Sequence, residues 1–141
     1  MQDAAIRLAS IAFAFMAGAA LAAPRVALPQ GDAQTGAEIY ARCGACHALT
    51  YDRTGPHHCG LFGRRAGSVP GFEYSAAMKH SQIVWSRATL DDFIAHPTKT
   101  IPGTSMGYAG VTDPRERADL IAYLWQANHS AVCKTIRPPS K

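Results

Sequence analysis

The chain has 141 residues, of which 48% are hydrophobic, and a formal net charge of +4 at pH 7. This length is enough for one domain with a modest core. The charge is only mildly basic, and the sequence shows no run of Lys or Arg and no basic helical pattern, so nucleic acid is not an expected partner. The positive excess fits either steering onto an acidic protein partner or solubility alone.

The N-terminal segment is typical of a signal for export. Residues 1–22 include a short apolar run and end in Ala20-Leu21-Ala22, a small-x-small cleavage site. We expect cleavage after Ala22 or Ala23, and prefer Ala22 because cutting after Ala23 would leave Pro24 directly behind the cleaved bond. The alternative is an uncleaved membrane anchor, although the run is shorter than the ~20 apolar residues of a spanning helix. The predicted location is the periplasm, where thiols oxidise.

The sequence shows no internal repeat and no long linker, which indicates a simple organisation. The predicted parts are a signal peptide at 1–22, a flexible leader at 23–30, one domain at 31–130 and a C-terminal tail at 131–141. The last five residues, 137–141, are expected to be disordered.

The first predicted helix begins at Gly31 or Asp32 and runs through Ile39 and Tyr40 toward a pair of cysteines. Gly36 lies inside this helix, where glycine costs about 1 kcal/mol relative to alanine. A close crossing with another helix would explain the glycine.

The segment Cys43-Gly44-Ala45-Cys46-His47 is the most informative motif of the chain, because this pattern marks attachment of c-type haem. Two thiols three positions apart lie close together on a helical turn and can form thioethers to the vinyl groups of a porphyrin. The next imidazole can then bind the iron. The motif predicts a redox function.

Two other kinds of protein site also contain a Cys-x-x-Cys pair, namely structural zinc sites and thioredoxin-like dithiols. A structural zinc site would need further ligands, but Cys59 and Cys133 are single and far apart, without a second short-spaced pair. A thioredoxin-like dithiol would need a βαβ context, and the sequence offers none.

Residues 55–71 are rich in Gly and Pro and are predicted to form an irregular loop that covers another group or segment of the molecule. A second helix is expected from about Ser86 to Ala95, with Pro97 ending it. No stretch of the chain alternates well enough to predict a strand.

The third helix has the clearest signals. Asp113 is the predicted N-cap, Pro114 takes the first helical position, and Glu116 stands three residues after the cap. Asn128 is the predicted end of this helix. The apolar residues that recur at helical spacing are Leu120, Ile121 and Leu124.

In these features the chain resembles the class I cytochromes c of mitochondria and bacteria over about residues 31–127. The matching segments are GDAQTG at 31–36, CGACH at 43–47, TGP at 54–56, GLFGR at 60–64, PGFEYS at 70–75, Trp85, IPGTSM at 101–106 and RADLIAYL at 117–124. The resemblance implies an all-α fold, with helices and loops wrapped around one haem c bound covalently through Cys43 and Cys46.

The resemblance also implies roles for single residues. His47 and Met106 would be the two axial iron ligands, while Met16 and Met78 would be ordinary core methionines. The carbonyl oxygen of Pro56 would accept the second ring N–H of His47. The residues that stand where the family binds the haem propionates are Arg64, Tyr74, Trp85 and Thr104. The family also implies that Gly36 and Tyr40 pack against Leu120 and Tyr123 where the first and last helices cross.

The chain departs from the family pattern at several positions. Phe93 stands where the family usually has an aromatic hydroxyl near the methionine sulfur, so we expect an altered bond between Met106 and iron. His58 replaces an apolar residue near the haem and is either a structural histidine or a rival ligand. Cys59 and Cys133 are expected to form a disulfide in an oxidising compartment.

The family's docking lysines are also few here. Near Met106 the sequence has Lys99, but Thr98 and Ser105 in place of further lysines, so the partners are expected to differ from the mitochondrial ones.

The function predicted from the sequence is that of a monohaem electron carrier with no enzymatic activity and no nucleic-acid partner. It is expected to be a monomer that exchanges single electrons with a respiratory complex, a terminal oxidase or a periplasmic dehydrogenase, and to meet the membrane only through these partners. The competing functions are an enzyme or sensor that binds a small ligand at an open iron, a dedicated subunit of one periplasmic dehydrogenase, and a structural metal protein.

Overall fold

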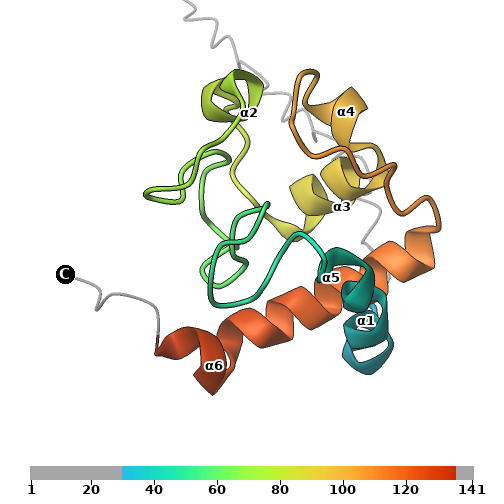
Figure 1. Cartoon of the computed structure of the whole chain (residues 1–141). Helices are drawn as coiled ribbons and strands as arrows, with labels where there is room; N and C mark the ends of the chain where they lie inside the picture. Colours follow the sequence, from blue (N-terminus) through green and yellow to red (C-terminus); the bar gives the residue numbers. More distant parts are fainter. Residues whose placement is uncertain (1–29, 136–141) are drawn as a thin grey trace, which may run out of the picture.

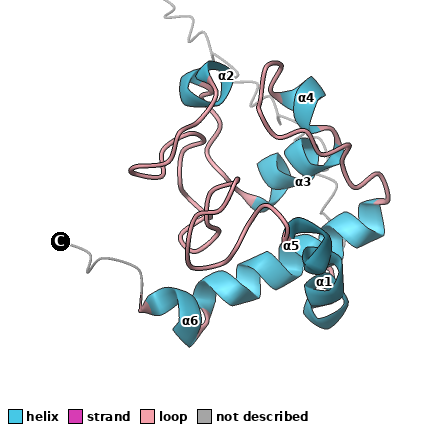
Figure 2. Cartoon of the chain, in the orientation of Figure 1, coloured by secondary structure: helices cyan, strands magenta, loops and turns pink. Residues whose placement is uncertain are grey.

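A computed structural model describes residues 30–135 of the chain, and these residues form helices joined by long loops (Figures 1 and 2). In chain order the elements are α1 (Ala33–Tyr40), the 3-10 turn η1 (Ala41–Cys43), α2 (Ala76–His80), α3 (Arg87–Ala95), α4 (Pro97–Thr100), α5 (Pro114–His129) and α6 (Ala131–Lys134). Extended segments in this part of the chain meet only in an isolated bridge between Arg65 and Val84. The predicted all-α fold is confirmed. Within residues 30–135, no helix is both long enough and apolar enough to cross a bilayer.

Helix α1 crosses α5 at close range, as Figure 1 shows. A Cβ atom on Gly36 would collide with the carbonyl oxygen of Asp119, and one on Gly31 would collide with that of Ala118. The ring of Tyr40 packs against Tyr123 of α5 with centroids 5.1 Å apart. The glycine inside α1 therefore lets the two backbones touch.

The long helices begin where a polar side chain accepts hydrogen bonds from backbone N–H groups that have no partner within the helix. Asp32 caps α1 by accepting a hydrogen bond of 2.7 Å from the backbone N–H of Thr35. Asp113 caps α5 by accepting one of 2.8 Å from Arg115. Glu116 does not close a capping box; it instead binds the guanidinium of Arg42 through two bonds of 2.8 Å, which ties α5 to η1.

A partly buried ion pair joins α5 to α3. The Nε atom of Arg117 donates to Asp91 at 2.7 Å, and both side chains are largely shielded from solvent. The same guanidinium donates to the carbonyl oxygens of Val111 and Thr112 at 3.0 and 2.9 Å. One arginine thus holds together α3, α5 and the segment that precedes α5.

The sequence predicted three helices and missed three short ones. The predicted second helix is α3, which Ser86 caps through Thr89 in a capping box. Pro97 follows α3 as expected, but it also begins α4. The missed helices α2, α4 and α6 have four or five residues each, too few for an apolar period to show.

The predicted domain limits stay predictions. Helix α6 begins at Ala131, so the first residues of the predicted tail are helical. The signal peptide, its cleavage site, Met16 and the last five residues lie outside the part of the chain that the structure describes.

Candidate functional site

The helices and the long loops between α1 and α3 enclose a cavity of about 470 Å³, within the size range of cofactor sites. Its walls carry many apolar side chains, among them Leu61, Leu90, Ile94, Val111, Leu120 and Leu124. All nine residues predicted as the site line this one cavity: Cys43, Cys46, His47, Pro56, Arg64, Tyr74, Trp85, Thr104 and Met106.

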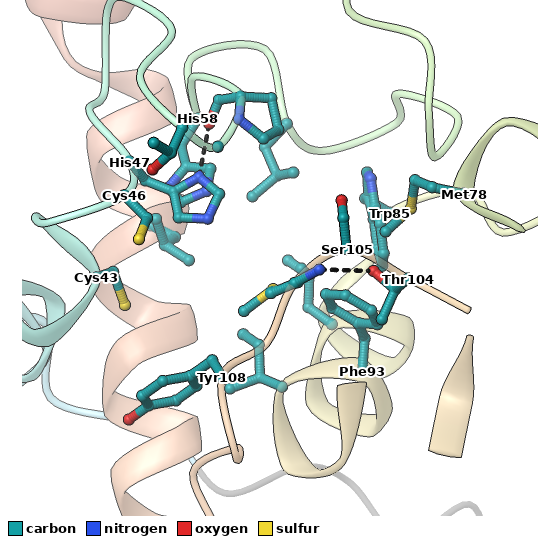
Figure 3. A pocket seen from close by; sticks show the side chains of 18 of the residues that line it. Cys43, Cys46, His47, His58, Met78, Trp85, Phe93, Thr104, Ser105 and Tyr108 are labelled. Carbon is teal, nitrogen blue, oxygen red and sulfur yellow. Dashed lines mark hydrogen bonds between the residues drawn. The ribbon is translucent and has the colours of Figure 1, made fainter. Parts of the chain in front are cut away.

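The cysteine motif forms a tight turn at one wall of the cavity. The backbone N–H groups of Cys46 and His47 both donate to the carbonyl oxygen of Cys43, at 3.1 and 2.9 Å. This turn places the two thiols and the imidazole on the same side, as Figure 3 shows. Both cysteines are free, and burial raises the pKa of the Cys43 thiol.

His47 is held in one orientation. Its Nδ1 atom lies 2.7 Å from the carbonyl oxygen of Pro56, a hydrogen bond that makes Nδ1 the protonated atom and leaves Nε2 free to bind a metal. Burial lowers the pKa of His47, against the effect of the Pro56 carbonyl, so the ring is neutral, as a ligand must be. Gly55 lies against the ring so closely that a Cβ atom there would collide with it.

The opposite wall comes from the segment between α4 and α5. Figure 3 shows Thr104 and Ser105 across the cavity from His47 and the cysteines, with Tyr108 below Cys43. Met106 also lines the cavity, and its backbone N–H donates to the Thr104 hydroxyl at 3.2 Å. Gly103 has a φ of 88°, a left-handed conformation that suits glycine and turns the chain back toward the cavity.

The other predicted residues, Arg64, Tyr74 and Trp85, also line the cavity. Arg64 donates to the carbonyl oxygens of Cys59 and His57 at 3.1 and 3.0 Å, so part of its guanidinium already holds a loop. Trp85 is buried beside Phe93, with ring centroids 5.1 Å apart. Burial raises the pKa of the Tyr74 hydroxyl, which therefore stays protonated and can donate a hydrogen bond.

Three of the other residues that line the cavity were not among the predicted site residues and bear on its chemistry. Met78, expected as a core methionine, is buried at the cavity wall. Tyr108 is exposed at the opening, two residues after Met106. His58 stacks on His47. The sequence held a signal only for His58, because a polar residue in place of an apolar one is a visible departure.

Cys59 and Cys133 form a disulfide in the structure. These two sulfurs are therefore committed to each other and do not complete a metal site with Cys43 and Cys46. Across residues 30–135, no group of three or more His, Cys, Asp or Glu side chains is placed to hold a metal ion.

The residues of the cavity fit haem c. Free thiols and a neutral imidazole share one wall, a thioether comes from the facing segment, and the space between is bounded largely by apolar side chains. Nitrogen and sulfur donors of this kind are axial ligands of cytochromes c.

Comparison with known proteins agrees with this fit. The family model Cytochrome c matches residues 33–128. A cytochrome c of Sesamum indicum is 44% identical over 103 residues, which cover 70% of this chain and 93% of the relative. A cytochrome c2 of Rhodomicrobium vannielii is 40% identical over 112 residues, covering 77% of this chain and 90% of the relative.

A solved structure supports the same assignment. Cytochrome cH from Methylobacterium extorquens superposes with a TM-score of 0.66 at 39% identity, covering 68% of this chain and 99% of that one. Fold, cavity and relatives lead to one conclusion: the chain belongs to the cytochrome c family and is an electron carrier with covalently attached haem c.

Proposed function

We propose that this protein is a monohaem carrier in which Cys43 and Cys46 would hold the haem and His47 and Met106 would bind its iron. The observation that carries the proposal is the presence of His47 and Met106 on facing segments of one apolar cavity that also contains the two free thiols. Haem c supplies an iron that gains and loses one electron.

The residues of the chain set the conditions for that exchange. Pro56 fixes the tautomer of His47 and makes the imidazole a better donor. The Thr104 hydroxyl holds the backbone of Met106, whose soft thioether favours ferrous iron. The apolar walls would limit water at a bound haem, and with His47 and Met106 both as ligands the iron would have no open position for a substrate. Arg64, Tyr74, Trp85 and Thr104 are proposed to bind the propionates.

The proposed partners are redox proteins of the periplasm: a respiratory complex, a terminal oxidase or a dehydrogenase. Exposed residues at the cavity opening, among them Cys46, Ser105 and Tyr108, are where a partner can approach the cofactor. Arg42 also reaches this opening, but Glu116 binds its guanidinium, so its charge is largely offset. The bacterial relatives support the proposed location, and we propose that the protein is a monomer.

Absorption spectroscopy of the exported protein, oxidised, reduced and reduced with CO, tests the ligand set. We expect a low-spin c-type spectrum, the charge-transfer band of methionine bound to ferric iron, and no change with CO. Met106→Ala should lose the band and bind CO. Met78→Ala, which shortens another methionine of the same cavity, is the matched control and should do neither.

Other results of these measurements would contradict the proposed ligands. If the unaltered protein bound CO readily, the iron would be open and the sensor or enzyme function would replace this proposal. If Met106→Ala kept the band, Met106 would not be the ligand. The mass of the purified protein reports both haem attachment and the cleavage site, after Ala22 or Ala23.

A further inference from the structure

We infer that His58 is a positioning residue that fixes the plane of the His47 imidazole, and that Tyr40 and the Cys59–Cys133 disulfide hold His58 in place. The inference rests on the proposed role of His47 as an iron ligand. It explains three residues that the electron-carrier function leaves unused: His58, Cys59 and Cys133.

The two imidazoles are stacked. Their ring centroids are 4.4 Å apart and their planes are inclined by 23°, and Figure 3 shows the two side chains together at the cavity wall. A flat ring against the face of another hinders tilting of its neighbour, and stacked aromatic pairs attract each other. Pro56 binds the Nδ1 edge of His47, and Gly55 lies close to the same ring. His58 therefore adds a stacked aromatic ring to the contacts that Pro56 and Gly55 make with His47.

Tyr40 fixes the His58 ring. The Tyr40 hydroxyl lies 3.1 Å from Nδ1 of His58, and this hydrogen bond is partly buried. Tyr40 itself ends α1 and packs on Tyr123 of α5. The orientation of His58 is thus tied to the crossing of α1 and α5, the most extensive helix contact in the described part of the chain.

The backbone at His58 is held on both sides. His58 and Cys59 donate to the carbonyl oxygens of Ala48 and Leu49 at 3.1 and 2.7 Å, which joins this loop to the segment just after His47. The disulfide ties Cys59, the next residue after His58, to α6.

A second interaction holds the loop at Leu61, two residues after Cys59. The backbone N–H of Leu61 donates to the side-chain oxygen of Asn128 at 2.9 Å, so the C-terminal part of α5 is also hydrogen-bonded to the loop. Arg64 adds bonds to the carbonyl oxygens of His57 and Cys59. His58 is therefore presented to His47 from a loop that cannot shift without breaking several bonds.

The plane of an axial imidazole has a spectroscopic signature. Its orientation determines how unpaired electron density spreads over the porphyrin of a low-spin ferric haem, and this sets the pattern of hyperfine-shifted haem-methyl proton resonances. Partners that orient a metal-bound histidine tune the metal in this way. A leucine at position 58 could fill the space, but it offers no flat face and no hydrogen bond to Tyr40.

The test is the proton NMR spectrum of the haem-loaded ferric protein and its variants. His58→Leu should change the spread of the haem-methyl shifts, while His58→Phe, which keeps a flat ring, should largely preserve it. Cys59→Ser with Cys133→Ser should shift the pattern in the same direction but less. His80→Leu, at an exposed histidine that ends α2, is the control and should leave the spectrum unchanged.

A His58→Leu spectrum identical to that of the unaltered protein would overturn the inference. If His58→Leu did not take up haem, Tyr40→Phe would decide, because it removes only a hydroxyl: a small shift supports the inference and an unchanged pattern overturns it. Failure of the proposed function looks different, since the unaltered protein would then show no low-spin His/Met spectrum at all.

Discussion

Gly36 of α1 lies directly against the backbone carbonyl of Asp119 in α5, with no room for a side chain between them. At an exposed position of a helix, replacing glycine with alanine adds about 1 kcal/mol of stability. Here the sign reverses, because a Cβ atom would force the two backbones apart. The contact of these two residues therefore determines the distance between α1 and α5. It also determines the position of the cavity wall that carries Tyr40 and the cysteine motif.

Gly36→Ala should lower the free energy of unfolding by about 1–3 kcal/mol, the usual cost of overpacking. Denaturant titration of the haem-loaded protein measures this. Ala37→Gly, at the exposed neighbouring position, is the control and should cost only the propensity difference of about 1 kcal/mol. A stabilising Gly36→Ala would show that the helices do not touch there.

The Cys59–Cys133 disulfide should leave the native, haem-loaded protein without titratable thiols. It closes a segment with a sequence separation of 74, for which the chain-entropy model gives about 4 kcal/mol of stabilisation. Replacing both cysteines with serine should therefore lower the denaturation midpoint markedly. Thiol titration before and after unfolding, with and without reductant, measures the pairing directly, and two reactive thiols in the native protein would contradict it.

Phe93→Tyr should place a hydroxyl in the buried cavity beside Trp85. A donor near the thioether of Met106 would withdraw electron density from sulfur, so the reduction potential should rise and ferric iron should lose Met106 at a lower pH. Voltammetry and a pH titration of the methionine–iron charge-transfer band measure the two effects. Phe62→Tyr, at a ring that packs on Trp125 instead, is the control. No change in either quantity would mean that Phe93 is too far from the sulfur to matter.

The N-cap of α1 should make stability depend on pH. Hydrogen bonds from Thr35 hold the pKa of Asp32 below its ordinary value of 3.8. A carboxyl with a lower pKa in the folded state stabilises above its unfolded pKa, and this contribution is lost as the pH falls through the folded pKa. Asp32→Asn keeps a cap but cannot ionise.

The unaltered protein should therefore be more stable than the Asp32→Asn variant at neutral pH, and the difference should shrink below pH 3.8, the ordinary pKa of the carboxyl. Denaturant midpoints of the two proteins at both pH values give the comparison. Asp32→Ala lacks the cap and should be the least stable of the three at neutral pH. If the difference between the unaltered protein and Asp32→Asn stayed constant with pH, the ionic part of the argument would be wrong.

Local signals in the sequence were sufficient for the three longer helices and the cysteine motif. Asp32, Ser86 and Asp113 cap helices because a short polar side chain replaces missing backbone partners, and this effect depends on a few neighbouring residues. Pro97 shows the limit of such signals. A proline ends one helix and suits the first turn of another, and the sequence alone does not tell which applies.

Tertiary structure decided what local patterns leave open. Glu116 has the spacing of a capping box, yet it binds Arg42, which is 74 positions away and comes near only when α1 and α5 cross. Met78 is a core methionine as the sequence predicted, but only the folded loops place it at the cavity wall. These contacts depend on chain segments that no window of sequence brings together.

By itself, the sequence determined the class of the protein: the Cys43–His47 spacing, the caps and the ordered series of matching segments specify an all-α haem protein, because each rests on local chemistry. Only the tertiary structure decided how the site is supported. The stack of His58 on His47, its bond to Tyr40 and its link through Cys59 to Cys133 join four separate parts of the chain. Such contacts arise from packing in three dimensions, and the residue types alone do not encode their geometry.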